Sequence, residues 1–171
     1  LSALGFDGVR IGLILSLTLA GDTAVSLWLT THADGLGRRR VLVAGAALMV
    51  LAAVVFALSS DFLVLLLAAT IGVISPSGNE VGPFLAVEQA ALAETLPAER
   101  RTGVFAWYNL AGQVATALGS LAGGLATTRL GELGVGEIGA YRSIVVAYAA
   151  IGVGLALLFS RVSPAVEVAP G

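Results

Sequence analysis

The sequence has no cysteine, no lysine and a single histidine, His32, and only 12% of its 171 residues are charged. Without cysteine, neither a disulfide nor a thiolate metal site is possible. A zinc site is not supported, because His32 has no second histidine or cysteine to share the metal. The net charge of -2 gives no reason to expect nucleic-acid binding. We therefore expect no metal, no cofactor and no nucleic-acid partner.

Apolar residues make up 57% of the chain. A soluble domain carries about 25% charged residues, so this chain has too little charge to cover a surface that faces only water. Apolar runs that suit a membrane-spanning helix of about 20 residues occupy five blocks: 11–31, 41–58, 62–93, 103–128 and 143–160. The runs are continuous rather than alternating, which favours helices over a barrel. The sequence predicts an all-α, polytopic membrane protein.

The nine basic residues are all arginines, and they divide unevenly between the two sides of the predicted membrane. One side carries the arginines at 38–40, 100–101 and 161, and the other carries Arg10, Arg129 and Arg142. Basic residues in short loops stay in the cytoplasm, so we predict that the first set and the C-terminal tail are cytoplasmic. The arginine-only basic set is consistent with a GC-rich bacterial genome, and we expect a bacterial inner membrane.

The connection between the first two blocks reads TTHADGLGRRRVL. It resembles the signature loop of the major facilitator superfamily. That loop has the pattern Gly, any three residues, Asp, any two residues, Gly, Arg, and then Arg or Lys. The matching positions are Asp34, Gly37, Arg38 and Arg39. Thr30 stands in place of the first glycine, and Gly35 in place of a basic residue. The turn LPAERRTG resembles the family's Pro-acidic-Arg turn, so the resemblance covers essentially the whole chain.

The resemblance implies that the five blocks are family helices two to six, with 161–171 opening the central cytoplasmic loop. Helix one and the second six-helix half would then be missing. This agrees with a chain that begins at Leu1 and has Met49 as its only methionine, and we expect a fragment of a longer protein. The resemblance also implies that the Asp34 carboxylate latches the two halves on the cytoplasmic side. Gly37 permits the tight turn that such a loop needs, and Asp34 can pair with Arg38.

Asp22 is the one charge in the first block. It lies twelve residues before Asp34, or roughly 18 Å at the rise of a helix, which places it near the middle of the bilayer. A carboxylate there is costly and usually faces a cavity or a partner, and burial raises its pKa toward physiological pH. Asp22 is a candidate for proton coupling. Alternatively, it makes a structural hydrogen bond with Thr18 or Ser26, each four residues away.

The third block contains SPSGNEVGP, in which Pro76, Gly78, Gly82 and Pro83 interrupt a membrane run. Proline removes a backbone donor and clashes with the preceding turn, and broken helices expose groups that bind substrate or ions. The side chains that would add to such a site are Asn79, Glu80 and, two turns later, Glu88. The alternative is that the stretch only reaches a water-filled mouth. Glu94, near the cytoplasmic turn, is expected to be solvated.

In the fourth block Asn109 and Gln113 are four residues apart and share a helix face. With Trp107 and Tyr108 they are candidates to line a substrate cavity, and the alternative is that they make polar contacts between helices. The small residues at 115, 119 and 123 form a ridge, which we interpret as a packing surface.

These features together predict secondary active transport of a small solute by alternating access, with proton coupling. The partners would be the solute, protons, the lipid bilayer and the missing second half. We expect no enzyme, because Ser75 and Ser77 have no histidine at membrane depth to activate them. The alternative function is a transporter-like sensor, or a partner-dependent subunit, that binds a ligand without moving it.

Overall fold

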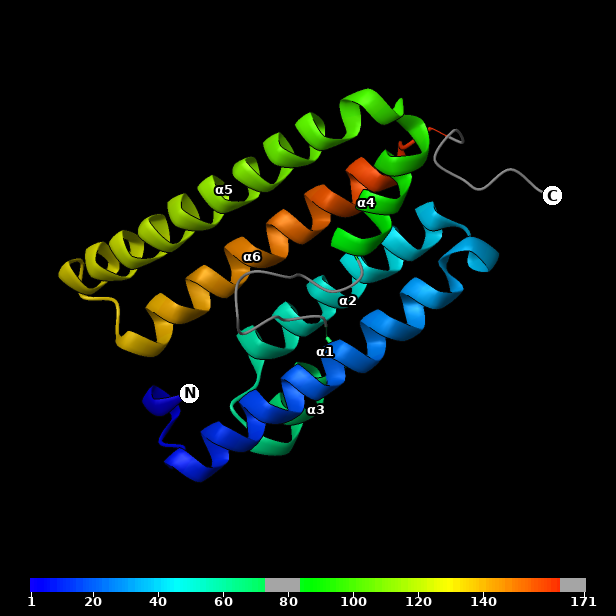
Figure 1. Ribbon diagram of the computed structural model, residues 1–171. Coiled ribbons are helices and arrows are strands. Elements are labelled where there is room, and N and C mark those ends of the chain that lie inside the picture. The colour runs from blue at the N-terminus through cyan, green and yellow to red at the C-terminus, as the bar shows by residue number, and fades with distance from the viewer. Residues whose placement is uncertain (73–83, 164–171) are drawn as a thin grey trace.

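The computed structural model describes residues 1–72 and 84–163, and helices make up most of these two stretches (Figure 1). After the short helix η1 (Ser2–Leu4) come α1 (Gly8–Leu36), α2 (Arg38–Leu58), α3 (Phe62–Ile71), α4 (Phe84–Thr95), α5 (Ala98–Glu132) and α6 (Glu137–Ser160). Each predicted block overlaps a helix, and α3 and α4 share the block 62–93. The interruption SPSGNEVGP, with Asn79 and Glu80, lies outside the described residues.

Local signals explain why several helices extend beyond the apolar blocks. Asp7 caps α1, and its carboxylate accepts the Arg10 N–H at 2.8 Å. Asp61 caps α3 in the same way, accepting the Val64 N–H at 3.1 Å. Such caps satisfy backbone donors that have no partner within the helix. The cap at Asp7 therefore lets α1 begin at Gly8, before the apolar block 11–31, whereas α3 begins at Phe62, where its block begins.

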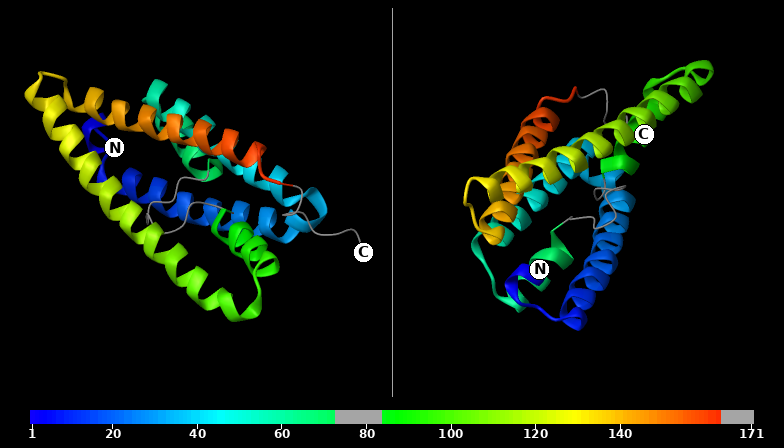
Figure 2. Two further views of the ribbon diagram at one scale, coloured as in Figure 1. Left: turned by 90° about the horizontal axis from the view of Figure 1, so that it is seen from above. Right: turned by 90° about the vertical axis from the view of Figure 1, so that its left-hand side faces the viewer.

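The ends of the helices gather at two opposite ends of the bundle (Figures 1 and 2). One end holds the α1–α2 turn, the α4–α5 turn and the end of α6. The other holds the start of α1, the α2–α3 turn and the α5–α6 turn. The six arginines at 38–40, 100–101 and 161 are consequently at one end, as the alternating connections predict.

The best-packed part of the molecule is built around α2, which lies against α6, α3 and α1. Its buried residues include Val41, Leu42 and Ala46, which belong to one cluster with Leu29 of α1, Val87 of α4 and Phe159 of α6. The Phe159 ring stacks on that of Phe84, with 5.4 Å between ring centroids. This cluster fixes α4 against α2, and so positions the polar residues of α4.

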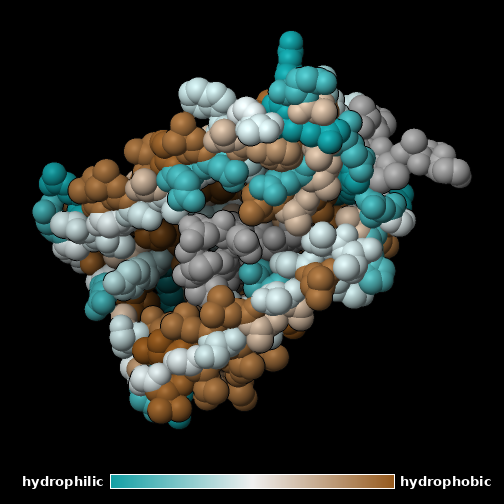
Figure 3. Space-filling view, viewed as in Figure 1, coloured by the Kyte–Doolittle hydropathy of each residue, from teal (hydrophilic) through white to brown (hydrophobic). Residues whose placement is uncertain are grey.

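Large apolar side chains remain exposed on the outside of the helices, among them Leu58 at 78% and Trp107 at 73%. Figure 3 shows broad apolar surface along the bodies of the helices, with hydrophilic surface at the ends of the bundle and in smaller patches between them. Within the described residues three helices are long and apolar enough to cross a membrane, namely α1, α2 and α6. Exposed apolar area of this extent requires lipid or protein to cover it.

Candidate functional site

The α1–α2 turn consists of one residue, Gly37, with a backbone φ of 93°. An L side chain rarely adopts this conformation, whereas glycine does so readily. The Gly37 N–H donates to the Ala33 carbonyl at 2.9 Å and closes α1, and α2 begins at the next residue. The turn therefore sets Arg38 directly beside the end of α1.

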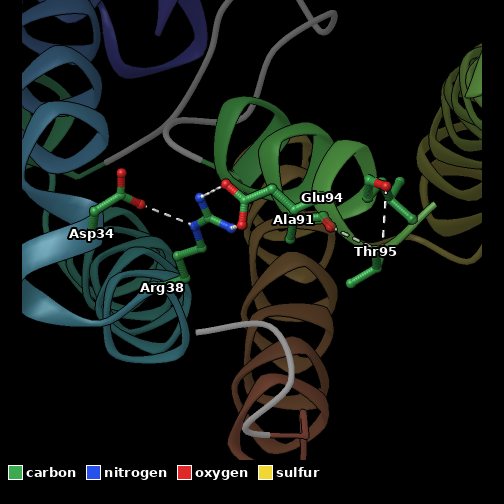
Figure 4. Close-up of polar contacts among 6 residues, drawn as sticks. Asp34, Arg38, Ala91, Glu94 and Thr95 are labelled. Carbon is green, nitrogen blue, oxygen red and sulfur yellow. Dashed lines mark hydrogen bonds and ion pairs between the residues drawn. The ribbon is translucent and has the colours of Figure 1, made fainter. Parts of the chain in front are cut away.

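Arg38 is buried, with 3% of its surface exposed, and it joins two carboxylates (Figure 4). Its Nε donates to Asp34 Oδ1 at 3.1 Å. Its Nη1 and Nη2 donate to the two Glu94 oxygens, each at 2.7 Å. Figure 4 shows the carboxylates approaching the guanidinium from opposite sides. We call these three residues the charged corner. It ties α1 and α2 to α4.

The pairing of Asp34 with Arg38, suggested by their spacing, is present in the structure. The interpretation of Glu94 as a merely solvated side chain is wrong, because it binds Arg38 through both oxygens. The hydrogen bond and the charge of Arg38 hold the pKa of Glu94 below its ordinary value. The sequence did not indicate this contact, because the burial of Arg38 is a result of helix packing. An arginine that is buried requires a carboxylate, and Glu94 is at the same end of the bundle.

Asp22 is half-buried and lines a cavity of about 440 Å³ between α1 and α4. On α1 the polar residues Asp22, Ser26 and Thr30 follow one another at intervals of four and share one face. Gln89 of α4 also lines the cavity. Ser26 Oγ lies 3.5 Å from Asp22 Oδ1. Thr18, the other partner that the spacing offered, donates instead to the Ile14 carbonyl at 2.6 Å.

The Asp22 carboxylate has the Ser26 hydroxyl beside it on the same helix. A carboxylate in this setting can keep its charge within a membrane span or accept a proton. The cavity combines apolar walls, from Leu27 and Leu85, with hydroxyl, amide and carboxylate groups that can orient a polar solute.

Glu88 lies on another side of α4, where the Tyr108 hydroxyl of α5 donates a hydrogen bond to its carboxylate. Both residues line a second cavity, of about 340 Å³, whose walls also include Leu42 and Phe159. The polar residues of α4 thus divide between two cavities, Gln89 in the first and Glu88 in the second.

The remaining candidates are placed differently. Asn109 and Gln113 are exposed on α5, and neither lines the two cavities described above. Arg39 is exposed at the start of α2. His32 is exposed and stacks on Trp28, with 4.9 Å between ring centroids. Within residues 1–72 and 84–163, no group of three or more His, Asp or Glu residues could hold a metal ion.

Comparison with known proteins places the whole chain in one family. Residues 1–171 match the Major Facilitator Superfamily. Over 151 residues the chain is 42% identical to an uncharacterized membrane protein of Saccharomyces cerevisiae, an alignment that covers 87% of this chain and 34% of the relative. The chain thus spans about a third of that relative's length. The relative is fungal and gives no support to a bacterial membrane. No solved structure matches the chain.

Proposed function

The chain belongs to the Major Facilitator Superfamily, and from that premise we propose that it forms part of a secondary transporter that moves a small solute by alternating access. The transport is coupled to protons. The observation that carries the proposal is the half-buried Asp22 carboxylate at the wall of a cavity of about 440 Å³. That cavity has the size and the mixed lining typical of small-molecule sites.

Proton coupling requires a group whose charge changes as the cavity changes sides. Burial disfavours an ionised carboxylate, and contact with water favours it. Asp22 would take up a proton while its cavity is open to the side of higher proton concentration, keep it while the cavity is closed, and release it when the cavity opens to the side of lower proton concentration. The Ser26 hydroxyl lies beside the carboxylate and can donate to its ionised form or accept from its protonated form.

The charged corner supplies a contact that can open and close. Arg38 binds carboxylates on two helices, and both carboxylates are more than half exposed, at 68% and 56%. Water can therefore hydrate the two carboxylates when the contact opens, but Arg38 has to leave its buried position at the same time, because a buried charge without a partner is costly. We place this end of the bundle in the cytoplasm, because it carries six of the nine arginines, and we assign Asp34, Gly37, Arg38 and Arg39 to a conformational latch.

The test is a proton-flux assay of the full-length protein in vesicles that contain a pH-sensitive dye. Sugars, amino acids and organic cations are added one class at a time. We expect one class to move protons, and Asp22→Asn to abolish that flux while the protein still inserts. Glu132→Gln is the matched control, because Glu132 pairs only at the surface with Arg129.

An Asp22→Asn protein that moves protons as the wild type does would remove Asp22 from the coupling mechanism. A protein that binds a solute but never accumulates it under an imposed proton gradient would instead be a sensor or a partner-dependent subunit. Accumulation of a solute without proton movement would support the proposal of transport and contradict the proposal of proton coupling.

A further inference from the structure

The arginines at the two ends of the bundle differ in what their side chains contact. At the end that holds the α5–α6 turn, each arginine side chain contacts the side chain of another residue, and these arginines are Arg10, Arg129 and Arg142. At the opposite end, three exposed arginine side chains make no hydrogen bond or ion pair with any residue that the structure describes: Arg40, Arg100 and Arg161. This second end therefore presents positive charge that the described part of the protein does not compensate.

Arg40 stands at the head of an exposed face of α2. Ala44, Ala47 and Leu51 follow it at intervals of four, three and four residues, which places them on one side of the helix, and all three are exposed. The two alanines are small, so the face between Arg40 and Leu51 is shallow. Eleven residues of helix span about 16 Å, which is roughly half of the 30 Å hydrocarbon thickness of a bilayer.

Leu51 leads from this face into an apolar groove between α2 and α3. The groove has a volume of about 270 Å³, and the described residues that line it are all apolar, among them Leu51 and Val55 of α2 and Leu67 and Ile71 of α3. Leu67 is 61% exposed and Ile71 is 53% exposed, so the groove is open to the outside of the bundle. It is smaller than small-molecule sites, which measure roughly 300–1,000 Å³ and carry polar groups that orient the ligand. A flexible hydrocarbon chain suits such a groove better than a solute does.

From these observations we propose that α2 binds an anionic phospholipid of the surrounding bilayer, with the headgroup phosphate at Arg40 and one acyl chain extending along α2 into the α2–α3 groove. A guanidinium binds a phosphate through two parallel N–H groups, and the apolar stem of an arginine can lie along a helix while its charge stays at headgroup level. The proposal goes beyond transport and does not depend on which solute is moved.

Other occupants would use only part of this surface. A soluble anion such as inorganic phosphate would match Arg40 but would leave the groove uncovered. A phospholipid without net charge would cover the groove but would leave the charge of Arg40 uncompensated. An anionic phospholipid satisfies both, because its charge and its chain are separated along the same direction as Arg40 and Leu51.

The experiment is a lipid titration of the full-length protein in detergent, followed by native mass spectrometry. The probe is dioleoyl phosphatidylserine, and dioleoyl phosphatidylcholine has the same chains without the net charge. We expect saturable binding of phosphatidylserine at concentrations at which phosphatidylcholine does not bind. Glycerophosphoserine, which is the same headgroup without chains, should not displace the lipid.

Arg40→Gln should weaken phosphatidylserine binding by about fivefold, which corresponds to about 1 kcal/mol for one basic residue beside an anionic lipid. Arg100→Gln is the matched control, because it removes the same charge from the same end of the bundle on a helix that does not line the groove. This control should bind phosphatidylserine as the wild type does.

Leu67→Trp tests the groove without changing Arg40. Because Leu67 is mostly exposed, the larger side chain should be tolerated by the fold, and we expect it to weaken phosphatidylserine binding by obstructing the acyl chain. Equal binding of the two lipids, or binding that Arg40→Gln leaves unchanged, would overturn the proposal. An equal loss in Arg40→Gln and Arg100→Gln would replace this site by a general attraction to the positive end. Displacement by glycerophosphoserine would reduce it to an anion site, and no saturable binding would mean that the rest of the longer protein covers the groove.

Discussion

Helices α2 and α5 are both long, yet they depend on opposite sources of stability. The 21 residues of α2 include eight buried ones, whereas the 35 residues of α5 include none. Figure 2 shows α5 running apart from α1 over much of its length. The helix α5 is supported by local features, with Glu99 in its first turn and Arg129 in its last, where each charge opposes the helix dipole. Length therefore does not reveal which helix forms the core, whereas apolar content does, because α2 is apolar enough to cross a membrane and the longer α5 is not.

The largest effect is expected where the packed region has no spare volume. A Cβ atom at Gly21 of α1 would lie 1.9 Å from the Thr70 carbonyl oxygen of α3. Backbone cannot move aside as a side chain can, so Gly21→Leu should lower the free energy of unfolding by about 3 kcal/mol. The measurement is the unfolding temperature of the full-length protein in detergent, followed by tryptophan fluorescence.

Gly12→Leu is the matched control on the same helix, because nothing lies within 4 Å of its added Cβ. Equal unfolding temperatures for the two variants would show that α1 and α3 do not approach closely at Gly21.

A substitution in the charged corner should lower the free energy of unfolding by a smaller amount. Arg38→Met keeps much of the volume but removes three hydrogen bonds to two carboxylates. Those carboxylates are more than half exposed, so water can hydrate them when the arginine is gone. We therefore expect the free energy of unfolding to fall by about 2 kcal/mol, which is less than the cost of leaving a buried charge without its partner. Arg40→Met, an exposed position on the same turn, should change the unfolding temperature little. A similar drop in both variants would indicate a general effect of charge.

Acid should remove part of the same contact. The pKa of Glu94 lies below its ordinary value of 4.5 because Arg38 binds the ionised form. A carboxylate whose pKa is lowered by folding stabilises the folded protein. This stabilisation is fully present at pH values above the ordinary pKa, and it is lost as the pH falls through the lowered pKa. The difference in unfolding temperature between the wild type and Glu94→Gln should therefore be present at pH 7 and shrink below about pH 4.5. A difference that grows with acid would contradict the Arg38–Glu94 contact.

The smallest effect is expected on α5. Nothing lies within 4 Å of a Cβ added at Gly119, and alanine is a better helix former than glycine by about 0.5–1 kcal/mol. Gly119→Ala should therefore leave the unfolding temperature unchanged or slightly raised. A clear fall in the unfolding temperature would mean that Gly119 lies against a close neighbour in the full-length protein. The difference in packing between α2 and α5 would then be smaller than described above.

The sequence was informative where a local rule decides the structure. Continuous apolar runs indicated the helices, the sequence Asp-Gly-Leu-Gly that ends at Gly37 indicated the tight turn, and a separation of four residues allowed Asp34 to meet Arg38. The alternating connections also indicated which arginines share one end. The first three features depend on residues close together in the chain, and the grouping of the arginines depends only on counting the membrane crossings between them.

What could not be predicted depends on the rotation of one helix against another. The Arg38–Glu94 contact joins residues 56 apart, and the orientation of α4 follows from packing by Phe84 and Val87, which no local pattern encodes. The same rotation sends Gln89 and Glu88 to different cavities. Asn109 and Gln113 share a face, as their spacing requires, but α5 leaves that face exposed rather than at either cavity.

The one-residue connection at Gly37 has a mechanical consequence. One residue spans about 3.8 Å between neighbouring Cα atoms, so α1 cannot slide along its axis without displacing the start of α2. Any such slide moves Arg38 at once, since Arg38 is the first residue of α2. A slide of α1 along its axis is therefore coupled to α2, and a shift of Asp22 along α1 is transmitted to the Arg38–Glu94 contact.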